Sequence, residues 1–182
     1  MLPLPAVWHP AVVHFPLVLL ALGGPAALAW AVRGSVFWRG VTLWLLVLGT
    51  AGAYVARETG EDLEHQVEGE PRVDAYLGEH EEAADWAFYL GLAATAVVGG
   101  ATGLSVWMAR RERTTAAETI FTTRLPGAGG GPRRAALALR IVGAVLALAT
   151  AAAVVRTAHF GGRMTWGEPA SGATPGPPAA TP

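Results

Sequence analysis

The stretch from Trp86 to Ala109, WAFYLGLAATAVVGGATGLSVWMA, contains no charged side chain and decides the fold. A run of about 20 mostly apolar residues is long enough to cross the hydrocarbon core of a bilayer as a helix. A helix is the favoured form there because it satisfies its own backbone hydrogen bonds within one segment. We therefore predict that this stretch is a transmembrane helix.

Three further stretches have the same character, and they run over about 11–32, 36–56 and 135–158. Of the 182 residues, 52% are hydrophobic and 15% are charged, whereas about 25% are charged in an average soluble protein. A chain of this length cannot bury so much apolar surface in a soluble core. The sequence predicts an all-α integral membrane four-helix bundle over residues 1–166. The Pro-, Ala- and Gly-rich residues 167–182 predict a disordered tail.

The charges predict the orientation of the bundle. Arg33 and Arg39 flank the short first loop, which has no acid, and the third loop is also rich in arginine. The second loop, residues 57–85, carries most of the acidic residues. Arginine-rich loops stay in the cytoplasm, so both termini and the second loop are expected outside, in a bacterial cytoplasmic (inner) membrane.

The second loop is expected to contain helix. Thr59 and Asp62 have the spacing of a capping box, which would start a helix at Thr59. After Pro71, an apolar stripe at helical spacing predicts a short amphipathic helix before the third crossing. The residues of this stripe are Val73, Tyr76, Leu77, His80 and Ala84.

Small residues predict where helices approach closely in the membrane. Gly99 and Gly103 have GxxxG spacing in the third crossing, and Gly49 and Gly52 lie in the second. We expect these faces to pack within one chain, and a contact between two copies is the alternative.

All five histidines fall on the predicted outer side: His9, His14, His65, His80 and His159. An imidazole can ligate a metal ion, hold haem iron or relay protons. The chain has no cysteine, so thiolate ligands are excluded. His65 is expected to face solvent, which leaves the other four as candidate ligands.

The first functional hypothesis is a redox protein that holds a b-type haem through two of His14, His80 and His159, since haem iron takes one or two axial side chains. Gly52, Ala83, Ala84 and Ala87 could leave a slot for the ring, and Glu79, Glu81 or Glu82 could orient His80. The second is a copper or zinc site formed by His9, His14, His80 and His159 with a carboxylate. The third is a structural or accessory membrane subunit without a cofactor, in which the histidines are polar links between helices.

The predicted partners are the lipid bilayer and either a membrane redox partner or a second copy of the chain. The arginine-rich third loop lies next to the membrane, where it would contact anionic lipid. A nucleic-acid partner is therefore not expected.

Four segments in order resemble a known family. They are His9–Pro16 (HPAVVHFP), Thr59–Asp62 (TGED), His80-Glu81 and His159–Gly162 (HFGG). Over roughly residues 6–167 the chain resembles the bacterial membrane-protein family of domain of unknown function 2231. The resemblance implies a four-helix bacterial membrane protein without an established activity. After the double glycine this chain reads RMTWG, where the family tends to have an apolar and aromatic strip.

Overall fold

The protein is a bundle of four long helices, and its computed structural model describes residues 9–67, 69–119 and 130–167. The elements are α1 (His9–Val12), α2 (His14–Arg33), α3 (Val36–Val67), α4 (Pro71–Asp74), α5 (Leu77–Thr119) and α6 (Gly130–Trp166). Four spans are long and apolar enough to cross a membrane: His9–Arg33, Val36–Val67, Leu77–Arg111 and Arg134–Trp166. The predicted all-α architecture with four crossings is confirmed. The expected tail, apart from Gly167, lies outside the described residues.

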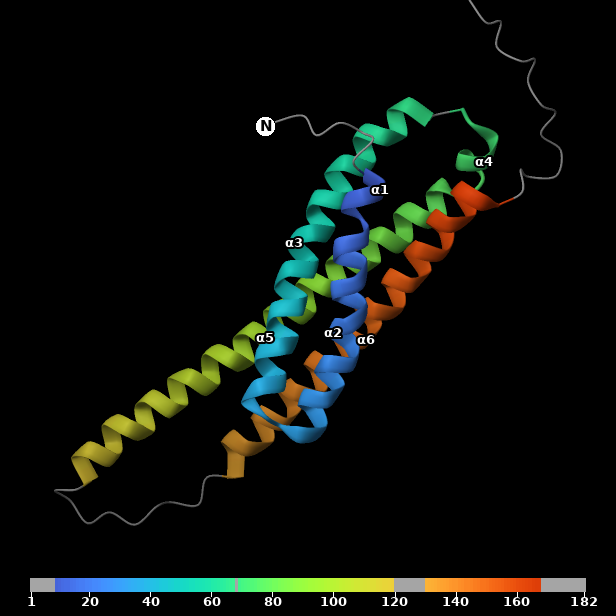
Figure 1. Cartoon of the computed structure of the whole chain (residues 1–182). Coiled ribbons are helices and arrows are strands. Elements are labelled where there is room, and N and C mark those ends of the chain that lie inside the picture. Colours follow the sequence, from blue (N-terminus) through green and yellow to red (C-terminus); the bar gives the residue numbers. More distant parts are fainter. Residues whose placement is uncertain (1–8, 68, 120–129, 168–182) are drawn as a thin grey trace, which may run out of the picture.

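The helices pack as a ring rather than as two separate pairs. α2 contacts α3 and α6, and α5 contacts α6 and α3. This order places α2 diagonally opposite α5, and α3 diagonally opposite α6. Figure 1 shows α1, the end of α3, α4, the start of α5 and the end of α6 together at one end of the bundle.

The core consists of a few large side chains and many small ones. Leu20, Leu46 and Val98 are completely or almost completely buried, together with alanines of α5 and α6. Threonines within the helices bond to carbonyls one turn earlier, as Thr150 does to Leu146. Such a bond satisfies the threonine hydroxyl without water, which makes these side chains tolerable at membrane depth.

Among the described residues, the GxxxG pair of α5 does not form a close helix contact. A side chain added at Gly103 would meet nothing within 4 Å, and one at Gly99 would meet only Leu43 at 3.9 Å. In Figure 1 the last part of α5 leans away from the other helices. The expectation of close packing at Gly99 and Gly103 within the chain was therefore wrong. Gly49, in contrast, faces Leu20 directly.

The second loop contains more helix than expected. α3 continues without a break to Val67, so Thr59 lies inside a helix and the predicted capping box does not start one. Of the residues predicted to form a helix before the third crossing, Val73 lies in α4, and Leu77, His80 and Ala84 lie in the first turns of α5. Tyr76 lies in the turn between these two helices. α5 is continuous from Leu77 into the third crossing. Both α3 and α5 therefore extend beyond the apolar stretches of the sequence.

Gly34 ends α2 in the left-handed region, with φ 62° and its N–H bonded to the Trp30 carbonyl at 2.8 Å. A Cβ at this position would collide with the guanidinium of Arg140. We expect Gly34→Ala to lower the free energy of unfolding by about 1–2 kcal/mol, the cost of a left-handed alanine. Thermal unfolding in detergent measures this effect. Gly40→Ala is the control because no atom of the described residues lies within 4 Å of its Cβ position. An equal loss of stability in Gly40→Ala would contradict the argument.

Candidate functional site: an imidazole layer at one end of the bundle

Two half-buried histidines each form a hydrogen bond between helices. His9 Nδ1 lies 3.0 Å from Thr59 Oγ1, which links α1 to α3. His80 Nδ1 lies 3.0 Å from the carbonyl oxygen of Thr157, which links α5 to α6. These four residues, His9, Thr59, His80 and Thr157, are called the imidazole layer below. Each of the four spans His9–Arg33, Val36–Val67, Leu77–Arg111 and Arg134–Trp166 contributes one residue to this layer.

The hydrogen bonds determine which ring nitrogen carries the proton. A carbonyl oxygen only accepts, so His80 Nδ1 is the donor to Thr157. The Thr59 hydroxyl has one proton, and it donates toward the carbonyls of Ala56 and Val55 at 3.0 and 3.2 Å. Thr59 Oγ1 therefore accepts from His9 Nδ1. When these rings are neutral, Nε2 carries the lone pair, which is the form that binds a metal.

Two glycines make room for these rings. A Cβ at Gly60 would lie 3.1 Å from His9 Cε1, and a Cβ at Gly161 would lie 3.3 Å from His80 Cε1. Both are closer than ordinary van der Waals contact between carbons. The His9 ring therefore packs against Gly60 and bonds to Thr59. The His80 ring packs against Gly161 and bonds to Thr157. His9 and His80 are also near enough to each other to interact electrostatically.

The other three histidines are exposed and are not part of this layer. His14 donates from Nδ1 to the Pro10 carbonyl one turn earlier on its own chain. His159 stacks edge-on against its neighbour Phe160, with ring centroids 5.5 Å apart. His65 is exposed on α3, as expected. The structure thus brings together His9 and His80 from the predicted set, while His14 and His159 point outward.

Three ion pairs and one arginine–tyrosine contact surround the imidazole layer. Arg57 on α3 binds Asp85 on α5 and approaches Glu61 at 3.5 Å. Arg163 on α6 donates to the Tyr76 hydroxyl at 3.0 Å. Arg156 lies 4.0 Å from Glu82. These contacts tie the acidic segment to the bundle, and the group that orients His80 is a backbone carbonyl rather than a neighbouring glutamate.

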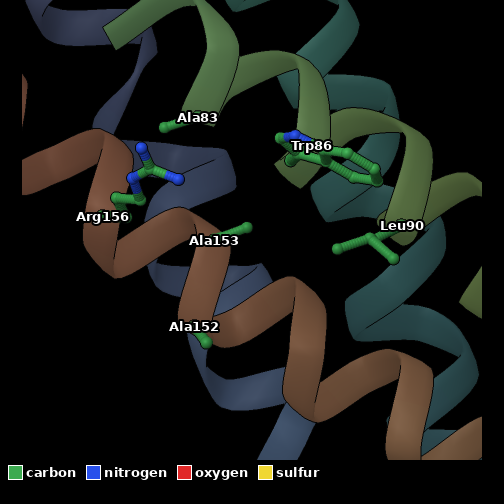
Figure 2. Close-up of a pocket in the computed structure, with 6 residues that line it drawn as sticks. All are labelled: Ala83, Trp86, Leu90, Ala152, Ala153 and Arg156. Atoms are coloured by element: carbon green, nitrogen blue, oxygen red, sulfur yellow. The ribbon is translucent and has the colours of Figure 1, made fainter. Parts of the chain in front are cut away.

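Two hollows on the described surface flank the layer. One, of about 390 Å³, is lined by Val12, Phe15, Leu48, Ala51, Gly52 and Val55. The other, of about 320 Å³, lies between α5 and α6 and is lined by Ala83, Trp86, Leu90, Ala152, Ala153 and Arg156 (Figure 2). Of the small residues expected to leave a slot, Gly52 and Ala83 line a hollow. Ala87 instead belongs to the packed core.

Within the described residues, no group of three or more His, Asp or Glu is arranged to hold a metal ion. The site therefore offers two imidazoles and no third ligand beside them. Thr59, Thr157, Gly60 and Gly161 are the members that sequence reasoning did not assign to the site. These residues lie inside or beside the TGED and HFGG segments, and that position was the sequence feature that could have indicated their place in the site.

Fold and site together define a multi-pass helical membrane protein with a polar layer at one end. The profile of the family described as "Predicted membrane protein (DUF2231)" matches residues 5–170, and the chain belongs to this family. Neither the curated proteins nor the solved structures include a match to the chain.

Proposed function

We propose that this protein is a membrane-embedded redox protein that binds a b-type haem at its imidazole layer, with His80 and His9 as the axial ligands. The observation that carries the proposal is the pairing of both Nδ1 atoms with oxygen acceptors. That pairing fixes each ring and leaves Nε2 as the ligating atom, as is usual for histidines that bind a metal. The two rings come from diagonally opposite helices at the same end of the bundle.

Haem is favoured over a bare metal ion by the number of ligands. A copper or zinc ion held by protein needs three or four donors, and the described part of the chain groups only two imidazoles here. Haem iron receives four nitrogens from the porphyrin and needs one or two axial side chains. The apolar hollow beside Gly52 supplies the kind of surface on which a ring packs.

The position of His9 and His80 also changes the ligand assignment. His14 and His159 are exposed, and a haem bound by them would lie on the outside of the bundle. The half-buried pair can tune the iron through burial and through the hydrogen bonds to Thr59 and Thr157. We place this end on the periplasmic side of a bacterial inner membrane, since the arginine-rich loops lie at the opposite end. A membrane redox partner would exchange electrons there.

A structural role is the second candidate, and one observation favours it. The bonds from His9 to Thr59 and from His80 to Thr157 already join helices and satisfy both Nδ1 atoms. Hydrogen bonds between transmembrane helices stabilise a bundle by about 0.6–2 kcal/mol each. An accessory membrane subunit would need nothing more from these residues.

The test is the visible absorption spectrum and the metal content of the full chain, produced with ample haem supply and purified in mild detergent. The proposal predicts a sharp Soret band and about one haem per chain. A colourless protein with stoichiometric copper or zinc would support the metal-ion alternative. A colourless protein without metal would overturn the haem proposal in favour of the structural role.

A further inference from the structure

The hollow between α5 and α6 combines an apolar floor with one poorly neutralised cation. Ala83, Ala152 and Ala153 form its floor, and Trp86 and Leu90 stand along the α5 side (Figure 2). The guanidinium of Arg156 lies at one end of the hollow and extends toward α5 (Figure 2). The hollow is therefore amphipathic, with its charge at one end.

Arg156 has little compensation from the protein. Its guanidinium approaches Glu82 at 4.0 Å, which is too far for a hydrogen bond, and the arginine side chain is 51% exposed. It lies 5.5 Å from the centroid of the Phe160 ring. Among the described residues, none accepts a hydrogen bond from it. A guanidinium has five donors in a planar fork that matches a phosphate group.

The depth of the hollow points to lipid. Trp86 follows directly after the last acid of the second loop, Asp85, and begins the uncharged stretch of α5. Tryptophan prefers the boundary between headgroups and acyl chains. Arg156 is the last charge before the apolar centre of α6 when the helix is followed inward from this end. A basic pocket between transmembrane helices can hold the headgroup of an anionic lipid.

We propose that this groove binds one anionic phospholipid, with Arg156 holding the phosphate and the alanine floor holding an acyl chain. The hollow beside Gly52 provides an internal comparison, because its six lining residues are all uncharged. That hollow can accept acyl chains but cannot select a headgroup. The lipid site is independent of haem binding, since it uses neither His9 nor His80.

The experiment uses the purified full-length chain, stripped of lipid and then offered equal phosphatidylglycerol and phosphatidylcholine. Native mass spectrometry counts the lipids that remain bound. We expect the wild type to prefer phosphatidylglycerol and Arg156→Gln to lower that preference by about tenfold or more, as expected for the loss of charge-assisted hydrogen bonds. Ala152→Leu, which fills the floor, should reduce retention of phosphatidylglycerol with the arginine intact.

Arg163→Gln is the matched control. It removes an arginine from the same end of α6, but that guanidinium is held by the hydroxyl and ring of Tyr76. The control should keep the preference of the wild type. Equal retention of both lipids by the wild type would overturn the proposal. So would an unchanged preference in Arg156→Gln, an equal loss in Arg163→Gln, or full retention in Ala152→Leu.

Discussion

His80→Ala is expected to lower haem affinity by about 100-fold or more, because loss of a group that merely orients a ligand already costs about 10- to 100-fold. The substitution removes the candidate ligand Nε2 and also the Nδ1 bond to Thr157. The Soret absorbance per chain, followed during haem titration, measures the effect. Circular dichroism and gel filtration of the same samples show whether the bundle remains folded.

Two further variants separate ligation from structure. His80→Asn keeps an N–H donor near the position of Nδ1 and has no imidazole, so it should retain the fold and lose the haem. His65→Ala is the matched control, because His65 is exposed on α3, and it should bind haem like the wild type. Haem binding that survives in His80→Asn would contradict the assignment of His80 as a ligand.

Gly49→Ala is expected to lower the free energy of unfolding by about 1–3 kcal/mol, the usual cost of overpacking a core. A Cβ at Gly49 would lie 2.7 Å from Leu20 Cδ2 and 2.8 Å from Leu20 Cγ. Leu20 is 1% exposed, so it is packed on all sides by other side chains. The α2–α3 contact must therefore widen. Unfolding of the detergent-solubilised protein with increasing denaturant measures the difference.

The double variant Gly49→Ala with Leu20→Ala makes this test specific. Leu20→Ala alone leaves a cavity, and the new methyl group at Gly49 would partly fill it, so the two costs should not add. Gly100→Ala is the control, since nothing in the described part of the chain lies within 4 Å of its Cβ position. Strictly additive costs, or an equal loss from Gly100→Ala, would show that Gly49 and Leu20 are not in close contact.

The four membrane-spanning helices could be predicted from the sequence, because an apolar run of sufficient length has few alternatives in a membrane. The rotation of each helix about its own axis could not be predicted from the sequence. The central parts of α2 and α6 carry apolar residues on all sides, so no pattern distinguishes the inward face from the lipid-facing one. For that reason His14 and His159 were grouped with His80, although they point outward. Small residues recur along α5 as well, so the GxxxG spacing of Gly99 and Gly103 does not identify the face that meets another helix.

Thr59 shows a second limit of sequence reasoning. Its spacing to Asp62 fits a capping box, yet α3 runs through both residues. The Arg57–Asp85 pair bridges this part of α3 to α5. Contacts that are distant in sequence therefore help to keep the helix continuous, and local spacing cannot reveal them. The partners of His9 and His80 became evident only when the helices were assembled.

The most direct test of the central claim is the electron paramagnetic resonance spectrum of the oxidised, haem-loaded protein at low temperature. If His9 and His80 hold one iron between them, the wild type gives the low-spin signal of two axial imidazoles. His9→Ala and His80→Ala, prepared separately, should each convert that signal to high spin. A low-spin signal that persists in both variants would contradict the account, because the iron would then be held elsewhere.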